Sequence, residues 1–282
     1  MTESGLGCPH WPLCTDRAVP LSTRASAIEY SHRAVVALVI ALVLWLWIWA
    51  WLRYRARPDV FWSTTAAVVL VPLQALLGAI AVWLDLPGWV VAFHFVVGML
   101  FLATVVSVAA FANRGAGGAA TPGFTRLAWG TAALGLVLVS VGATVVAVDA
   151  DTACGKQWPA CNGGFVSGGG HAGVQVAHRM LAYAVAVLAV ALFVQARRGK
   201  GPRLAGMLPL AAVLVQIGFG IALVFVGGAG RAYEILSGFH VGGAGAVWVT
   251  LVVLAVLTSP PLRASAQRQQ SLPAGTRADL PT

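Results

Sequence analysis

Four histidines with a repeated spacing are the residues of this chain best suited to bind a metal. His32 and His94 are 62 residues apart, and His178 and His240 repeat that spacing 146 residues later. Each lies about one helical turn inside an apolar run. A neutral imidazole is a good axial ligand of heme iron, and facing helices can supply two of them. The repeated pairs therefore predict two bis-histidine heme sites. A packing role, the alternative for a single intramembrane histidine, does not explain four in register.

Charged residues flank the first histidine of each pair. Arg33 and Arg179 follow it directly and suit heme propionates as charge-assisted partners, with interfacial anchoring as the alternative. Glu29 lies three residues before His32 on the same helix face, whereas the matching residue of the second half is Gln175. A carboxylate close to the apolar phase is costly unless it is paired or used. Glu29 therefore predicts a reactive first half and a stable heme in the second, with pairing to Arg33 as the alternative.

The four cysteines form two close pairs in polar segments. Cys8 and Cys14 precede the first histidine, Cys154 and Cys161 precede the third, and Trp-Pro stands before the last cysteine of both pairs. An oxidising outer compartment favours one disulfide within each pair. Structural metal binding is the alternative, but neither segment supplies a compact set of four ligands.

The elements that carry these residues are apolar enough to lie in a membrane. The chain is 59% hydrophobic and 10% charged, whereas a soluble domain has about 25% charged residues. Apolar runs of about 20 residues match the thickness of a bilayer. We predict seven spans, near 31–52, 61–83, 89–111, 127–148, 174–196, 204–226 and 236–257. Gln74 and Gln216 lie in the middle of corresponding spans and are candidates for hydrogen bonds between helices.

The repeat includes the loops and predicts one helix more than the chain contains. Cys154 lies 146 residues after Cys8, and Cys161 lies 147 residues after Cys14. The span 127–148 precedes the second cysteine loop, and its counterpart would lie before residue 3. We therefore expect an all-α membrane protein of two tandem four-helix-bundle repeats, the first without its first helix. The natural protein would have eight spans; a genuine seven-span protein is the alternative.

The expected division of the chain follows from the same repeat. It comprises an N-terminal repeat at 1–111, a cytoplasmic linker at 112–126, a C-terminal repeat at 127–257 and a disordered cytoplasmic tail at 258–282.

The distribution of charge predicts how the chain is oriented. Alternate connections and the tail hold 12 of the 18 basic residues and two of the nine acidic ones, leaving six basic and seven acidic residues on the other side. The positive-inside rule places the cysteine loops outside and the C-terminus in the cytoplasm. The net charge of +9 is therefore explained by topology, and no nucleic-acid partner is expected.

With these features in place, the sequence resembles the heme A synthase family over about residues 3–257. The motifs are Ser4-Gly5-Leu6-Gly7-Cys8-Pro9, Trp11-Pro12-Leu13-Cys14, Glu29-Tyr30-Ser31-His32-Arg33 and His178-Arg179, together with His94 and His240. The resemblance implies an eight-helix membrane enzyme of two similar halves. Such an enzyme oxidises one ring methyl of heme O to the formyl group of heme A for terminal oxidases, by successive oxidation that removes four electrons. This chain departs from the family in lacking the first helix.

Carried over by position, the resemblance implies different roles for the two histidine pairs. His178 and His240 would hold a resident heme b as cofactor. His32 and His94 would bracket the substrate heme O, with Glu29 as the essential acidic residue beside it. The N-terminal repeat would then be the catalytic half.

The resemblance also implies the surroundings of the protein. These are the bacterial plasma membrane and its lipid, with heme O synthase and terminal oxidase assembly proteins as candidate partners; a homo-oligomer is compatible with them. Two other classes of function stay open, namely a di-heme membrane cytochrome for electron transfer and an assembly protein that hands heme O on unchanged. The difference between Glu29 and Gln175 favours the enzyme, because a symmetrical electron relay has no need of it.

Overall fold

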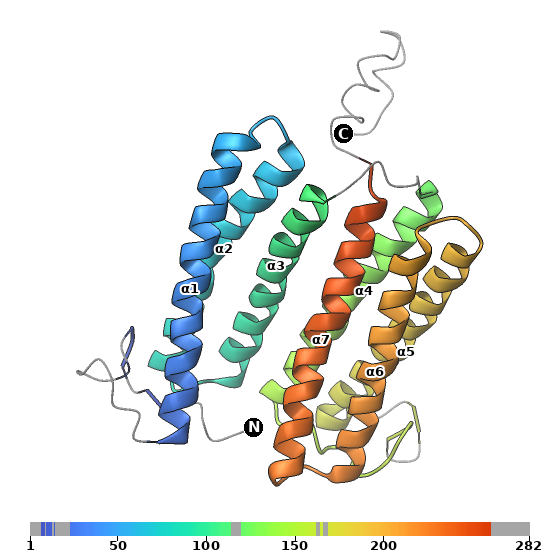
Figure 1. Ribbon diagram of the computed structural model, residues 1–282. Helices are drawn as coiled ribbons and strands as arrows, with labels where there is room; N and C mark the ends of the chain where they lie inside the picture. Colours follow the sequence, from blue (N-terminus) through green and yellow to red (C-terminus); the bar gives the residue numbers. More distant parts are fainter. Residues whose placement is uncertain are drawn as a thin grey trace.

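The computed structural model describes residues 7–8, 10–12, 14, 23–113, 120–161, 164–165 and 169–260. Seven helices make up most of this part of the chain (Figure 1): α1 (Arg24–Arg53), α2 (Pro58–Trp83), α3 (Gly88–Ala112), α4 (Pro122–Ala147), α5 (Gly170–Arg197), α6 (Arg203–Val226) and α7 (Arg231–Thr258). All seven are long and apolar enough to cross a membrane, and the described residues contain no β-strand. The all-α membrane class is therefore confirmed. The predicted tail from residue 261 onward lies outside the described residues.

Several helices begin before the apolar run that predicts them. α1 starts seven residues ahead of the expected span, because Thr23 caps it. The Thr23 hydroxyl accepts the backbone N–H of Ser26, and the Ser26 hydroxyl accepts the N–H of Thr23. This reciprocal capping box satisfies two N–H groups that a helix start leaves unpaired. The extra turns are polar, so hydropathy alone does not reveal them.

The helices pack in two groups (Figure 1). α4, α5, α6 and α7 form a closed four-helix bundle, because α7 packs back on α4. In the first half of the chain, α2 lies between α1 and α3, and α3 joins this row to the bundle by packing on α4 and α7. Among the described helices, α1 contacts α2 alone.

The two halves meet in a hydrophobic core that includes Trp248 of α7. This side chain is 5% exposed and packs in a cluster with Met99 of α3, Val139 of α4 and Val185 of α5. Its indole Nε1–H donates to the backbone oxygen of Met99 at 2.7 Å. In a bilayer, helices associate through packing and hydrogen bonds because lipid is as apolar as the side chains. This contact therefore fixes the first half against the second.

Candidate heme sites and the loops that cover them

All four histidines lie at one level of the helix assembly. They occur in α1, α3, α5 and α7, which start from the same end of the molecule, six to nine residues after the first residue of each helix (Figure 1). With a rise of 1.5 Å per residue, this places them about 9–14 Å from that end. The cysteine loops precede α1 and α5, so they lie at the same end.

The structure brings His178 and His240 together with the spacing of two ligands of one metal. Their ring centroids are 6.3 Å apart and the ring planes differ by 71°. An imidazole nitrogen binds a first-row metal at about 2 Å. Two imidazoles on opposite sides of one iron therefore have nitrogens about 4 Å apart and ring centres about 6 Å apart. The separation of these two rings is therefore the one expected for two ligands of a single metal ion.

Three of the candidate ligands lie against a glycine of a neighbouring helix. A Cβ atom added at the glycine would approach the ring Cε1 to 3.0 Å for His178 with Gly142 of α4, 3.3 Å for His240 with Gly220 of α6, and 3.5 Å for His94 with Gly78 of α2. At these positions a side chain would occupy the space of the imidazole or touch it. Each glycine therefore leaves the space that the neighbouring ring occupies, and we say in this sense that it seats the ring.

The first histidine pair is less enclosed than the second. His32 is exposed, and no ring contact like that of the second pair joins it to His94 within the described chain. The difference has a structural cause. α5, which carries His178, packs on both α4 and α6, whereas α1, which carries His32, packs on α2 alone among the described helices.

Both cysteine pairs are disulfides, as their spacing predicts. Cys8 is bonded to Cys14 and Cys154 to Cys161, and all four residues are at most 3% exposed. The alternative of a metal site is not supported: the described residues contain no group of three or more side chains able to hold a metal ion.

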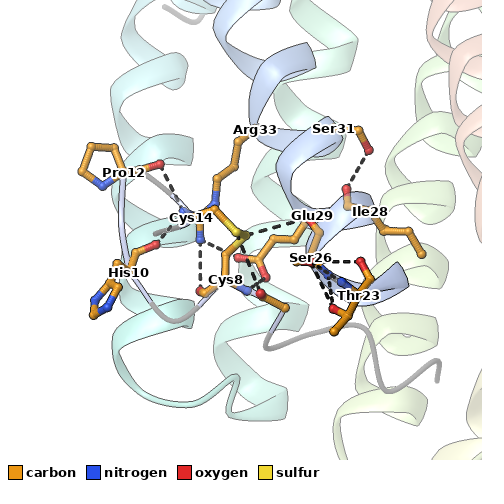
Figure 2. Close-up of a disulfide and its surroundings, with 11 residues drawn as sticks. Cys8, His10, Pro12, Cys14, Thr23, Ser26, Ile28, Glu29, Ser31 and Arg33 are labelled. Atoms are coloured by element: carbon orange, nitrogen blue, oxygen red, sulfur yellow. Dashed lines mark hydrogen bonds and ion pairs between the residues drawn. A yellow bond between two sulfur atoms is a disulfide. The ribbon is translucent and has the colours of Figure 1, made fainter. Parts of the chain in front are cut away.

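Glu29 and Gln175 hold the two loops in the same way. The backbone N–H of Cys8 donates to Glu29 Oε2 at 2.9 Å, and that of Cys154 donates to Gln175 Oε1 at 2.8 Å. Figure 2 shows the first of these contacts, with Glu29 reaching from α1 toward Cys8. The second carboxylate oxygen of Glu29 pairs with Arg33. The ion pair between Glu29 and Arg33, which was the alternative to a reactive role of Glu29, is therefore present.

The two arginines bind backbone carbonyl oxygens of the loops. Arg33 donates to the oxygen of His10 at 2.6 Å and to that of Pro12 at 3.1 Å (Figure 2). Arg179 donates to the oxygens of Gln157 at 2.8 Å and Ala160 at 2.7 Å. Holding the loop backbone is thus one role of both residues, and it differs from the propionate contact and from the interfacial anchoring that the sequence suggests.

Arg179 keeps one donor that the described protein does not use. The side chain is 8% exposed, and its Nη2 is buried without a hydrogen-bond partner in the described part of the chain. A buried donor without a partner is costly, and more so when it is charged. No carboxylate pairs with Arg179 among the described residues, because the residue matching Glu29 is the neutral Gln175. The second half therefore offers positive charge beside His178.

The sequence pattern revealed the four histidines but not the glycines that lie against their rings. Gly142 gave no signal among the 32 glycines of the chain. Gly78 and Gly220 share a signal that was missed, because each lies four residues after the corresponding glutamine, Gln74 or Gln216. Gln216 was noted only as a candidate for a bond between helices. That bond exists: its Nε2 donates to the backbone oxygen of His240 at 2.7 Å.

Comparison with known proteins gives a consistent family. Residues 23–253 match the model of the COX15-CtaA family, described as cytochrome oxidase assembly protein. The heme A synthase of Halalkalibacterium halodurans is 32% identical over 80% of this chain and 80% of its own length. That of Symbiobacterium thermophilum is 31% identical over 70% and 68%. For that of Exiguobacterium sibiricum, 30% identical, the match spans 64% of this chain and 62% of the relative.

Proposed function

We propose that this chain, which belongs to the heme A synthase family, oxidises one ring methyl of heme O to the formyl group of heme A. The observation that carries the proposal is the one chemical difference within a repeated scaffold. Both halves present a histidine, an arginine and a side chain that accepts the first cysteine N–H of a disulfide loop, but this last residue is Glu29 in one half and Gln175 in the other. Two electron-transfer sites would not need that difference.

The second half is proposed to hold a resident heme b. His178 and His240 would be its axial ligands, since their rings have the required separation. The unpartnered Nη2 of Arg179 would donate to a propionate, which supplies both the missing acceptor and the opposite charge. A heme b in this position supplies a reversible one-electron redox centre. The closed bundle of α4 to α7 suits a cofactor that stays bound.

The first half is proposed to bind the substrate, with His32 and His94 on its two sides. Here Glu29 neutralises Arg33, so the pair offers less net positive charge to a heme carboxylate than Arg179 does. Weaker retention suits a site that must accept heme O and release heme A. Glu29 is the carboxylate nearest to His32 in sequence and would position the reacting group or take up protons released on oxidation.

Orientation and partners complete the proposal. The protein would lie in the bacterial plasma membrane with the cysteine loops outside and the C-terminus in the cytoplasm, in lipid, with contacts to heme O synthase and oxidase assembly proteins. A cysteine-reactive reagent that does not cross membranes, applied to intact cells after reduction, should label Cys154 and Cys161. If both cysteines were labelled only after the cells are opened, the loops would lie on the cytoplasmic side and the proposed orientation would be wrong.

The activity is tested by identifying hemes by mass. The chain, and a version extended upstream, would be expressed in cells that make heme O but no heme A, and the non-covalent hemes extracted. We expect heme A or its hydroxylated precursor, and its loss with Glu29→Gln. Asp85→Asn, in the exposed turn between α2 and α3, is the matched control and should retain activity. Heme b with untouched heme O in both versions would instead favour a di-heme cytochrome.

A further inference from the structure

Three of the candidate heme ligands meet the helix that precedes their own in the same way. The glycine that seats each ring stands four residues after a residue whose backbone lies within hydrogen-bonding reach of that ring. The sets are Gln74, Gly78 and His94 in α2 and α3, Leu138, Gly142 and His178 in α4 and α5, and Gln216, Gly220 and His240 in α6 and α7. The same spacing therefore occurs at three separate helix contacts.

A spacing of four has a physical reason in a helix. In the middle of a helix the backbone N–H is engaged, but the carbonyl oxygen has a second lone pair that can accept a further hydrogen bond. The side chain four residues later lies over that oxygen: in α4 the hydroxyls of Thr131 and Ser140 donate to the oxygens of Leu127 and Leu136, both at 2.8 Å. A glycine has no side chain to cover the oxygen. The three glycines therefore open a backbone acceptor to the ring that they seat.

Each ring turns its Nδ1 edge toward this helix. A Cβ added at Gly142 would lie 3.2 Å from Nδ1 of His178 and 4.0 Å from its Nε2. At Gly220 and Gly78 the Cβ would lie 3.8 Å and 4.0 Å from Nδ1 of the neighbouring ring, and Nε2 is farther away in both cases. Nε2 is thus the more distant nitrogen at all three contacts, which leaves it free to bind a metal.

The three Nδ1 atoms have no other acceptor among the described residues. Nδ1 of His94 and of His178 is buried and has no hydrogen-bond partner of good geometry within this part of the chain. Nδ1 of His240 lies 3.2 Å from the side-chain Nε2 of Gln216, which donates to the His240 backbone oxygen at 2.7 Å and, as an amide nitrogen, accepts no hydrogen. A proton on Nδ1 is therefore left with the uncovered carbonyl.

An imidazole that binds iron through Nε2 carries its proton on Nδ1, and an acceptor for that proton fixes the tautomer and the orientation of the ring. We propose, resting on the heme binding in the proposed function, that the backbone carbonyls of Gln74, Leu138 and Gln216 accept the Nδ1–H of His94, His178 and His240. The seating glycines are then positioning residues, because they uncover these oxygens. Since the acceptor is a backbone atom, the side chain of that residue is free to differ, as leucine and glutamine do here.

A pair of substitutions at Gly220 separates this role from simple packing. Gly220→Ala adds a Cβ 3.3 Å from His240 Cε1. The hydroxyl of Gly220→Ser donates in addition to the Gln216 oxygen, as Thr131 does to Leu127. In protein that contains heme b alone, from cells that make no heme O, Gly220→Ser should have a higher reduction potential than Gly220→Ala, because a weakened acceptor at Nδ1 makes the imidazole a poorer donor to ferric iron. We also expect it to bind heme b about 10- to 100-fold more weakly.

Gly218→Ala and Gly218→Ser are the matched control pair, since a Cβ at Gly218 meets nothing within 4 Å. These two variants should share one potential. Equal potentials in the two Gly220 variants, or an equally large difference between the two Gly218 variants, would overturn the proposal.

A direct measurement on wild-type protein loaded with heme b decides the matter if the Gly220 variants lose their heme. With ¹⁵N in the histidine rings and ¹³C in the backbone carbonyl of glutamine, solid-state NMR should show a dipolar coupling between a protonated ring nitrogen and a glutamine carbonyl carbon. Absence of this coupling would overturn the proposal. Coupling without heme A formation in heme O-producing cells would support it while refuting the proposed activity, and heme A formation without coupling would do the reverse.

Discussion

Replacing the glycines that seat the imidazoles gives a graded test of the proposed ligands. Gly142→Ala places a Cβ 3.0 Å from His178 Cε1, whereas ordinary contact begins at 3.4 Å, so the ring must retreat by the difference of 0.4 Å. The same comparison gives 0.1 Å for Gly220→Ala, with its Cβ at 3.3 Å from His240, and no displacement for Gly78→Ala at 3.5 Å. Metal–ligand distances are held within about 0.2 Å. Only the first substitution exceeds that tolerance.

The expected size follows from the displacement. Gly142→Ala should weaken heme b binding about tenfold or more, which is about 1.4 kcal/mol per factor of ten. Gly220→Ala should have a small effect on heme binding, and Gly78→Ala none. Alanine itself favours a helix over glycine by about 0.5–1 kcal/mol, so a general loss of folding is not expected. Gly130→Ala in α4 and Gly218→Ala in α6 are matched controls, since their added Cβ atoms meet nothing within 4 Å.

The assay is heme loss from the purified protein. Each variant, loaded with heme b, would be mixed with an excess of an apoprotein that captures free heme, and the loss followed by absorbance. We expect Gly142→Ala to lose heme fastest and the two controls to match wild type. The reasoning would be refuted if Gly142→Ala kept heme as long as Gly130→Ala. Faster loss from Gly218→Ala than from Gly142→Ala would refute it equally.

Three further substitutions test other contacts. Trp248→Phe leaves the Met99 carbonyl without its indole donor and should lower the free energy of unfolding by about 1–3 kcal/mol; an unchanged thermal transition would contradict this. Arg179→Gln removes charged hydrogen bonds to the loop and should cost about 1.5–3 kcal/mol on the same measurement, with the exposed Arg197→Gln as control. Gln175→Glu should pair with Arg179 and speed loss of heme b, and slower loss would show that the neutral residue has no such role.

The order and number of helices in the described chain could be predicted because each depends on a long apolar run, which is a local property. The start of α1 could not, since it depends on the hydroxyl groups of Thr23 and Ser26. Both disulfides were predictable because each pair is close in sequence, six or seven residues apart.

The contacts of Glu29 illustrate what the sequence did not reveal. Its ion pair with Arg33 lies within one helix at a spacing of four and was considered in advance. Its bond to the Cys8 N–H was not, because a backbone group carries no residue-specific signal. The glycine seats were missed for a related reason. Gly142 has no side chain, which leaves room for the His178 ring. That room depends on how α4 and α5 pack, which the sequence pattern does not show.

Because both loops are held through their backbone atoms, their shape does not depend on which side chains they expose. Arg33 and Arg179 bind carbonyl oxygens, which every residue possesses, so a change of loop side chain leaves the anchor intact. The exposed residues already differ: His10 precedes the tryptophan in one loop, and Lys156-Gln157 in the other. Two loops with the same anchor can thus evolve unrelated exposed surfaces, each free to acquire its own docking partner, without a change in the arginine that holds the loop.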